Sequence, residues 1–420
     1  MPLIRLALAS LANRRASALI VLLVIALSSA LLLTVERVRT ETRLSFANTV
    51  SGTDLLVGAR AGSINLLLYA VFRIGHATHN IRWDSYQQIA ALPQVKWAIP
   101  LSLGDSHRGY PVLGTSADYF THYRYGERQA LQLREGRPFA DLYDVVLGAE
   151  VARALGYRLG QRLVLAHGTG RISLTRHDDK PFRVSGILAP TGTPVDRTLH
   201  ISLAGMQALH IDWKQGVPVR GRARLDAEQA RQQDLTPQAI TAVLLGLEQR
   251  VATFAVQRAI NDYRGEPLLA VLPGVALQEL WSLMASAEQA LLLVSACVVL
   301  VGLLGMLTAL LASLGERRRE MAILRSVGAR PWQIAALLLA ETGALTLAGL
   351  LGGLGLLYLT LLAGRGWLLS EYGLHLPLSA PSAHEWQLLG ATLLAGLLLG
   401  LLPAWRAYRQ SLVDGLSIRL

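Results

Sequence analysis

Histidine is the residue type in this chain with the widest scope for site chemistry. The chain has 10 histidines, and His76 and His79 stand three positions apart in VFRIGHATHN. On a helix, residues at i and i+3 share a face, and neutral imidazoles at that spacing can bind a divalent metal ion such as zinc. His76 and His79 are therefore candidate metal ligands. The alternative is that histidines simply collect in the water-exposed parts of the chain.

Signatures of catalysis are absent from the sequence. A nucleotide-binding P-loop needs a lysine directly after glycine, and none of Lys96, Lys180 and Lys214 follows one. Neither HExxH nor GxSxG occurs, and CxxC cannot occur because Cys297 is the single cysteine. We therefore expect no catalytic residues and no cofactor bound by this chain, which excludes ATP hydrolysis through a P-loop of its own.

The segment ERRREMAILRSVGARP, Glu316 to Pro331, is dense in charge and lies between two long apolar runs. Such charge cannot lie in hydrocarbon, and its sign predicts a short loop on the cytoplasmic face. The composition favours a helix up to Val327, with Gly328 as its αL cap and Pro331 in the first turn of the next helix. The patterned apolar residues beneath the charges favour a docking surface for a soluble partner over a simple charge anchor; they are Met321, Ile323, Leu324 and Val327.

The wider composition indicates a protein that is partly in lipid and partly in water. Hydrophobic residues make up 52% of the 420 residues and charged residues 16%, with a mean hydropathy of +0.37. Four segments are long and apolar enough to span a bilayer: 16–35, 290–314, 334–362 and 386–405. The first is too long for a signal peptide and lacks an A-x-A cleavage site, so we interpret it as a retained anchor.

Arginines predict the orientation of these spans. They flank the first span at 5, 14 and 15, fill the loop at 315–333 and follow the last span at 406, 409 and 419. Both termini, at 1–15 and 406–420, are therefore expected in the cytoplasm, and the segments 36–289 and 363–385 outside it. The same loops contribute most of the net charge of +11, and since no basic patch is interleaved with aromatic residues, a nucleic-acid partner is not expected.

The segment 36–289 is predicted to be a large α+β domain, so the fold class is an integral membrane α-helical protein with a large α+β domain between helices 1 and 2. The strand-like runs are VKWAIPLSL, YPVLGTS, DVVLGAE, QRLVLAHG, FRVSGIL and TLHISL, and the helical ones are DSYQQIAALP and AEVARALGY. Both ends of the domain have helical character and would extend the membrane helices as a stalk. The stretch 220–250 reads as helical or as a solvated insertion, and residues 104–106 and 192–194 read as tight turns.

Small residues and one acid mark the spans themselves. Gly349 and Gly353, and likewise Gly396 and Gly400, have the spacing that lets helix backbones approach closely, either within one chain or between two copies. Glu341 lies about two turns from the cytoplasmic end of the third span, where it can pair with an arginine of the loop; a proton pathway is the less favoured alternative.

At these residues the chain resembles the FtsX/MacB-type ABC transporter permeases. ERRREMAILRSVGARP is similar to the family's ATPase-contacting helix and turn, LIRLALASLANRRASALIVLLVIALSSALLL to its N-terminal helix and first span, and LLPAWRAYRQSLVDGLSIRL to its closing span and tail. The tail departs from the family, which carries Asp-Pro where this chain has Val413-Asp414-Gly415-Leu416. The resemblance implies coupling to an ATPase through these residues: Glu316, Arg317, Arg318, Arg319, Glu320, Met321, Leu324, Arg325 and Gly328.

The resemblance also implies partners and a mechanism. A separate ATPase subunit would bind ATP and Mg, a second permease copy or a paralogue would complete a dimer in the lipid of the bacterial inner membrane, and the stalk would move a MacB-like periplasmic core domain, the mechanism called mechanotransmission. The expected outcome is export or release of a lipid, lipoprotein, peptide or drug-like substrate. The alternative is a regulatory or scaffold membrane protein whose periplasmic domain controls a periplasmic partner or binds a metal such as zinc.

Overall fold

The computed structural model of the chain describes residues 14–168, 177–211, 213–214, 217–218, 225–316, 318–372 and 378–409. These residues fall into two compact units. The helical unit comprises Met1–Glu41, Ala285–Gly366 and Leu376–Leu420, and the sheet unit comprises Thr42–Met284 and Trp367–His375. Most of the predicted N-terminal helix at 1–15 and of the tail at 406–420 lies outside the described residues.

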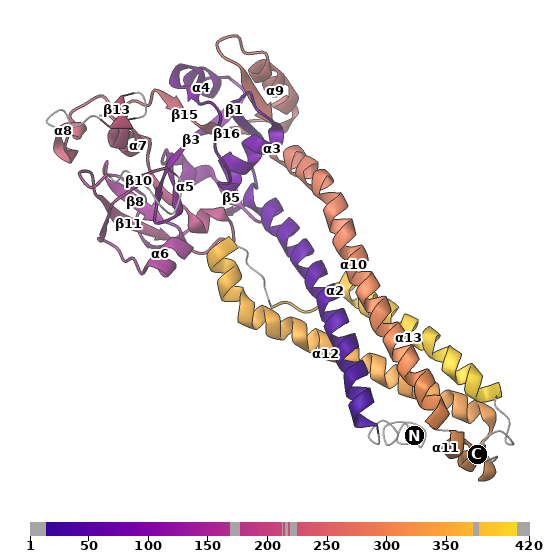
Figure 1. Ribbon diagram of the computed structural model, residues 1–420. Coiled ribbons are helices and arrows are strands. Elements are labelled where there is room, and N and C mark those ends of the chain that lie inside the picture. The colour runs from indigo at the N-terminus through magenta and orange to yellow at the C-terminus, as the bar shows by residue number, and fades with distance from the viewer. Residues whose placement is uncertain are drawn as a thin grey trace. The chain divides into compact units, whose positions relative to one another are not determined.

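Four long apolar helices could each cross a membrane, which confirms the predicted number of spans. They are α2 (Arg15–Thr49), α10 (Pro273–Glu316), α12 (Pro331–Tyr372) and α13 (Ala383–Arg409), and Figure 1 shows them as the longest ribbons of the chain. Both α2 and α10 continue far beyond their apolar windows, as the stalk prediction requires. α12 also continues beyond the predicted end of the third span at residue 362, because it runs to Tyr372.

The helical unit is held together by an apolar core to which all four long helices contribute. Val21 and Ile25 of α2, Leu303 of α10 and Leu345 of α12 are buried together, and Leu399 of α13 packs against them. Large apolar side chains on the outer faces of the same helices remain exposed. A helix that is apolar all round and buried on one side only is what a bilayer environment favours.

The sheet unit is built on an 11-stranded sheet whose main path runs β17-β1-β16-β3-β4-β12-β8-β11-β7, with β10 added to β3 and β9 to β11. Most pairs are antiparallel, and β4–β12 and β8–β11 are parallel. The strands are β1 (Leu55–Ala59), β3 (Val95–His107), β4 (Tyr110–Thr115), β7 (Leu133–Gly136), β8 (Asp144–Leu147), β9 (Arg162–Leu163), β10 (Ala166–His167), β11 (Phe182–Leu188), β12 (Leu199–Ser202), β16 (Ala242–Leu247) and β17 (Leu268–Val271).

Shorter elements surround this sheet. Three two-stranded pairs are β2 (Ile81–Arg82) with β15 (Ala239–Ile240), β5 (Arg124–Tyr125) with β6 (Gln129–Ala130), and β13 (Trp213–Lys214) with β14 (Val217–Pro218). The helices are α3 (Ser63–Leu67), the π-helix η1 (Leu68–Phe72), α4 (Trp83–Ala90), α5 (Asp118–His122), α6 (Ala149–Leu155), the 3₁₀ turn η2 (Pro194–Arg197), α7 (Leu203–His210), α8 (Ala227–Arg231), the 3₁₀ turn η4 (Arg250–Ala252) and α9 (Thr253–Asn261).

The predicted strands and the two predicted helices all occur, although QRLVLAHG is divided into the short β9 and β10. The helical interpretation of 220–250 is wrong for most of the described part of that stretch. Only α8 is an α-helix there, and Ala242–Leu247 forms β16, fully buried between β1 and β3. A short, continuous apolar run has the same pattern in a central strand as in a buried helix, so periodicity could not separate the two.

α7 lies close against the sheet because glycine leaves room for it. A Cβ on Gly114 of β4 would lie 2.9 Å from the Cβ of Met206, closer than two such atoms approach. Ser202 caps the helix, its Oγ accepting a hydrogen bond from the Gly205 N–H at 2.9 Å. Met206, Ala208 and Leu209 are buried against β4, β8 and β12 in one cluster. This packing fixes where the C-terminal residue of α7, His210, lies.

Candidate functional sites

The predicted coupling loop is a helix followed by a sharp turn and a second helix. α11 (Arg318–Ser326) ends in a Schellman motif, in which the Gly328 N–H donates to the Arg325 carbonyl at 3.0 Å and the Ala329 N–H to the Leu324 carbonyl at 2.9 Å. Gly328 has φ +101°, a conformation that favours glycine, and Pro331 opens α12. The cap and the proline therefore stand where the sequence predicted them.

The side chains of this loop divide into an inner and an outer set. Met321 packs against a buried cluster that includes Leu314 and Ile334, and so attaches α11 to the ends of α10 and α12. Ile323 and Val327, one helical turn apart, are 54% and 84% exposed. Leu324 and Arg325 are half-buried. Among the predicted coupling residues, Arg317 lies outside the described residues, as do the side chains of Glu316, Arg318, Arg319 and Glu320.

The predicted small-residue faces make contacts between helices of this one chain. A Cβ on Gly349 of α12 would lie 2.6 Å from Ile25 Cγ2 of α2, and one on Gly353 would lie 2.8 Å from the Ala26 carbonyl oxygen. Gly396 and Gly400 of α13 face α12 in the same way, 2.7 Å from Thr346 Oγ1 and Thr342 Cγ2. The sequence left open whether these glycines form contacts within one chain or between two copies. In this structure, all four lie against helices of the same chain.

Three acids of the helical unit are buried: Glu36 and Glu385 at 2% exposure and Glu341 at 1%. Glu341 lies in α12, as predicted. Glu385, at the start of α13, was not singled out: its carboxylate accepts two hydrogen bonds from the Arg37 guanidinium, at 2.8 and 3.0 Å. It also accepts the Ser382 N–H at 2.6 Å, while the Ser382 Oγ accepts the Glu385 N–H at 3.2 Å. One side chain therefore caps α13 and joins it to α2.

His76 and His79 do not share a helix face. The π-helix η1 ends at Phe72, and its C-terminal cap Arg73 is in the left-handed region with φ 60°, so both histidines follow in an exposed loop. His76 lines a cavity of about 250 Å³, which Asp105 also lines. The metal hypothesis for His76 and His79 assumed that both residues lie on a helix, and they lie in a loop instead.

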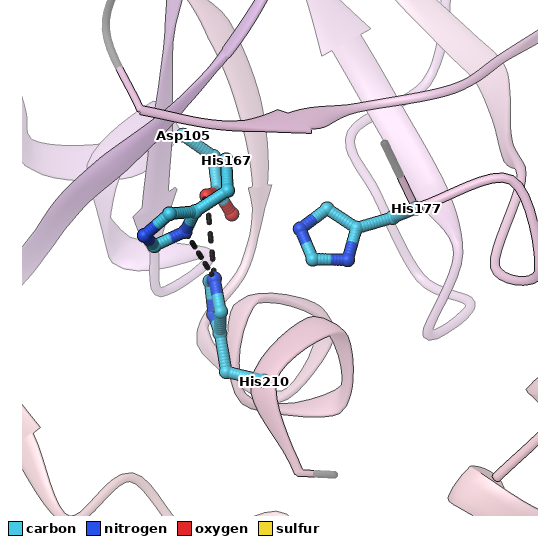
Figure 2. Close-up of side chains that lie close together, drawn as sticks. All are labelled: Asp105, His167, His177 and His210. Carbon is cyan, nitrogen blue, oxygen red and sulfur yellow. Dashed lines mark hydrogen bonds and ion pairs between the residues drawn. The ribbon is translucent and has the colours of Figure 1, made fainter. Parts of the chain in front are cut away.

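A different group of side chains converges in the sheet unit: Asp105, His167, His177 and His210 each offer one ligand atom, and these four atoms lie within 4.8 Å of one another. Figure 2 shows the carboxylate of Asp105 and the rings of His167 and His210 gathered together, with the His177 ring facing them. The four residues belong to separate parts of the chain: β3, β10, the segment before β11 and the C-terminal end of α7.

A β-bulge determines where Asp105 points. Leu103 of β3 pairs with Leu113 of β4, and Ser106 pairs with Pro111, so β3 carries one extra residue in between. Leu103 and Ser106 consequently share a face, and Asp105 lies on the opposite one, which α7 covers. The same strand then pairs with β10, which sets His167 directly across from Asp105. Residues 104–106 thus form a bulge inside a strand, which corrects the predicted tight turn. The turn of this hairpin is at Arg108–Gly109, both with positive φ.

Three of the four ligand atoms form a small triangle. His167 Nδ1 lies 3.1 Å from Asp105 Oδ1 and 3.1 Å from His210 Nε2, and His210 Nε2 lies 3.3 Å from Asp105 Oδ1. The His210 ring is held from behind by its Nδ1, 3.1 Å from the Met206 carbonyl oxygen. Asp105 is fully buried, whereas His167 is 42% exposed, so the triangle is reachable from solvent on one side.

Burial and the contacts among these four side chains determine their charges. Burial alone would raise the pKa of Asp105, but hydrogen bonds to His167 and His210 lower it to about 2. Burial lowers the pKa of His177 to about 4, despite the opposing charge of Asp105. Burial would also lower the pKa of His210, but its hydrogen bond to Asp105 raises that pKa above the ordinary value. At neutral pH the group therefore holds one carboxylate and a neutral His177 imidazole.

Sequence reasoning missed this group, although one signal was present. The strand-like runs VKWAIPLSL and YPVLGTS are joined by GDSHRG, in which an aspartate and a histidine stand two positions apart. We interpreted Asp105 as a turn residue because Gly-Asp-Ser is typical of turns. The pairing of β10 with β3 and the position of the α7 end are tertiary facts, and nothing in residue spacing along the chain predicts them.

Comparisons with known proteins place both halves of the chain. The family model described as "MacB-like periplasmic core domain" matches residues 16–262, more than half of the chain, and the one described as "FtsX-like permease C-terminal" matches residues 292–412. The pyoverdine export ATP-binding/permease protein PvdT of Pseudomonas aeruginosa is 27% identical over 354 residues, which are 80% of this chain and 47% of that protein. The chain thus spans about half the length of this curated relative.

Further similarities are more limited. The uncharacterized ABC transporter permease YknZ of Bacillus subtilis is 33% identical over 125 residues, 28% of each protein. Among solved structures, the periplasmic region of MacB from Actinobacillus actinomycetemcomitans matches 55% of this chain and 94% of that one, at 11% identity and a TM-score of 0.34. The extracellular domain of the noncanonic ABC-type transporter YknZ from Gram-positive bacteria matches 52% and 99%, at 13% identity and a TM-score of 0.31.

Proposed function

The chain belongs to the ABC transporter permeases that combine a MacB-like periplasmic core domain with an FtsX-like membrane domain, and we propose that it is the transmembrane subunit through which a separate ATPase moves that periplasmic domain. The ATPase binds ATP and Mg²⁺, and this chain contributes no catalytic residue. The movement exports or releases a lipid, lipoprotein, peptide or drug-like substrate. The observation that carries the proposal is the exposed apolar edge of α11.

α11 has the features of a docking element. It is attached to the membrane helices through Met321, and the Schellman turn at Gly328 connects it rigidly to α12. Its outer edge presents Ile323 and Val327 to solvent, beside Trp332 at the start of α12, which is 54% exposed. Exposed large apolar side chains held on a rigid scaffold are typical of protein interaction sites. Because the chain belongs to an ABC transporter permease family, we propose that the ATPase is the protein that binds these side chains.

The orientation of the chain supports the same assignment. Short flanks next to the membrane helices carry more arginine on one side than on the other, and cytoplasmic flanks carry such an excess. In the described residues these flanking arginines are Arg14, Arg15, Arg325, Arg330, Arg406 and Arg409. We therefore place both termini and α11 in the cytoplasm, where ATP is available, and the sheet unit in the periplasm.

Continuous helices provide a route for the movement. α10 has 44 residues and α2 has 35, so at 1.5 Å per residue they extend about 66 and 52 Å, against about 30 Å of hydrocarbon. α10 begins in the sheet unit's part of the chain and ends next to α11 without an interruption. A displacement of α11 by the ATPase is thus passed along one helix to the domain outside the membrane.

The helical unit also leaves surface for lipid and for a second copy of the chain, or a paralogue. Gly349, Gly353, Gly396 and Gly400 already lie against other helices of the same chain, so a dimer would use the outer faces of the helices. Those faces carry large exposed apolar side chains on α2 and α10, among them Leu19, Ile20, Leu23, Leu291, Leu293, Val294 and Val301. We propose that two permease subunits and two ATPase subunits form the assembly.

Affinity purification from the native membrane in a mild detergent tests this proposal. We expect the wild-type chain to bring down a P-loop ATPase, identified by mass spectrometry, and Mg-ATP hydrolysis in the purified fraction. Val327→Asp places a charge in the proposed contact and should reduce the recovered ATPase at least about tenfold, equivalent to about 1.4 kcal/mol. Val251→Asp is the matched control, because Val251 is 85% exposed and belongs to the sheet unit.

Two results would contradict the proposal in different ways. If the wild-type chain recovers no ATPase, the coupling function itself is wrong, and the regulatory or scaffold alternative gains. If the ATPase is recovered equally with Val327→Asp and with Val251→Asp, the chain is a coupled permease but α11 does not form the contact.

A further inference from the structure

We propose that Asp105, His167, His177 and His210 bind one transition-metal ion, with Zn²⁺ the best-fitting ion. No other group of described histidines, cysteines and acids brings three or more ligand atoms together in this way. The inference concerns the sheet unit only. It is independent of whether the chain couples to an ATPase, and it replaces His76 and His79 as the candidate ligands.

The spacing of the ligand atoms fits a tetrahedral ion. A zinc ion with bonds of about 2.0–2.1 Å has ligand atoms about 3.3 Å apart along each tetrahedron edge. The three contacts among Asp105 Oδ1, His167 Nδ1 and His210 Nε2 are 3.1, 3.1 and 3.3 Å. The ligand atom of His177 lies within 4.8 Å of the others, so it would need to approach by no more than about 1.5 Å to complete the tetrahedron.

Hydrogen bonding fixes which nitrogen of His210 is the ligand. A carbonyl oxygen can only accept, so the Nδ1 facing the Met206 carbonyl carries a proton, and in the neutral ring Nε2 carries the lone pair. That lone pair points at the Asp105 carboxylate, 3.3 Å away. Two acceptor atoms at this distance need a cation between them, either a proton or a metal ion. A ligand histidine whose other nitrogen donates to a backbone carbonyl is also the usual arrangement in metal sites.

A buried atom of Asp105 points to the same conclusion. Asp105 is fully buried, and among the described residues nothing forms a hydrogen bond with its Oδ2. A buried carboxylate oxygen without a partner loses its hydration without compensation. A metal ion held by this carboxylate supplies the missing interaction, either by bidentate binding or by neutralising the group.

The donor set selects the class of metal. Three imidazoles and one carboxylate suit Zn²⁺ and neighbouring first-row ions, whereas Mg²⁺ and Ca²⁺ require mostly oxygen ligands. Four protein ligands fill a tetrahedral ion, and a filled coordination shell is typical of structural rather than catalytic zinc. The ion would connect the β3–β10 edge, the segment before β11 and the C-terminal end of α7, so its loss should loosen α7 from the sheet.

Metal analysis of the full-length protein tests the proposal. The protein is purified in detergent with a tag that contains no histidine, stripped with chelator and re-exposed to Zn²⁺, and bound metal is measured by mass spectrometry and calorimetry. We expect about one Zn²⁺ per chain and a rise in the unfolding temperature on binding. Co²⁺ in place of Zn²⁺ should give the visible absorption bands of a tetrahedral site, a signal that a merely structural hydrogen-bond network cannot produce. Mg²⁺ and Ca²⁺ should have no effect.

Substitutions decide which residues hold the ion. Asp105→Asn keeps the side-chain volume and His177→Ala removes the ligand that stands furthest from the others; each should weaken Zn²⁺ binding at least about 100-fold, beyond what loss of a supporting contact costs. The control His76→Ala/His79→Ala should bind like the wild type. The proposal is overturned if the wild type binds no Zn²⁺ at micromolar concentration, if the Asp105 and His177 variants bind as tightly as the wild type, or if only the control loses binding. Circular dichroism of each variant shows whether a loss of binding reflects misfolding, and His210→Gln then provides a second isosteric test.

Discussion

The ion pair between Arg37 of α2 and Glu385 of α13 should behave as one energetic unit. The two side chains are 4% and 2% exposed, and the guanidinium forms two hydrogen bonds to the carboxylate, at 2.8 and 3.0 Å, plus one of 2.6 Å to Ser379 Oγ. Arg37→Met keeps the apolar stem but leaves the Glu385 charge buried, with the Ser382 N–H as its remaining hydrogen-bond donor among the described residues. Removing one partner of such a pair costs about 3–5 kcal/mol.

A double-mutant cycle measures this cost separately from the loss of packing. Glu385→Gln removes the charge but keeps an oxygen for the Ser382 N–H, so the double variant Arg37→Met/Glu385→Gln should recover much of the loss. We expect the two single changes to differ from additivity by at least about 1.5 kcal/mol. The assay is equilibrium unfolding in mixed micelles, with helical content as the readout. Arg365→Met is the control in the same unit: Arg365 is an exposed residue of α12, and we expect about 1 kcal/mol at most.

The reasoning is refuted if Arg37→Met costs less than about 1 kcal/mol, or if the single effects simply add in the double variant. Additivity would mean that each side chain acts through its own packing. The connection between α2 and α13 would then rest on the apolar core rather than on the charges.

Further predictions concern packing, pH and topology. Gly353→Leu should destabilise the helical unit by about 1–3 kcal/mol because a Cβ there meets α2, whereas Gly355→Leu, with nothing within 4 Å, should be near neutral in the same unfolding assay; equal effects would contradict the packing contact. Burial lowers the pKa of His200 to about 3, so only the unfolded chain takes up this proton between about pH 6.5 and 3. Stability should therefore fall as the pH drops through that window, by about 2 kcal/mol at pH 5, and a His200→Leu variant that keeps the same slope would refute the assignment. In a background without the native cysteine, Val251→Cys should react with a membrane-impermeant thiol reagent once the outer membrane is opened, and Val327→Cys only after the inner membrane is opened; the reverse pattern would invert the proposed topology.

The helical unit was largely readable from the sequence because its elements depend on local composition. Apolar length alone identifies a spanning helix, and the turn after α11 follows from Gly328 and Pro331. Six strand-like runs were recognised because a short apolar run was bounded by turn residues, whereas β1 and β17 were not predicted. β16 was missed because Ala242–Leu247 is apolar on both faces, as a central strand must be, and so lacks the alternation that identifies a strand.

The histidine and aspartate group was beyond such reasoning for a different reason. Its members meet only after β10 pairs with β3 and α7 packs on β4, and both events depend on contacts between distant parts of the chain. Spacing along the sequence favoured His76 and His79, which are near neighbours in the chain but lie in a loop. Spacing of i and i+3 places two side chains on one face only when a helix carries both residues.

The bulge in β3 means that the proposed metal site depends on the length of the hairpin as well as on its ligands. Adding one residue to β4 opposite the bulge would make the pairing between Leu103 and Ser106 one-for-one, and regular alternation from Leu103 would then turn the Asp105 carboxylate toward the other face of the sheet. A related chain could therefore keep an aspartate and all three histidines and still lack the site. In tracing this property through relatives, the difference between the number of residues in β3 and in β4 from the Leu103–Leu113 pair to the Arg108–Gly109 turn is a more informative marker than the identity of any single ligand.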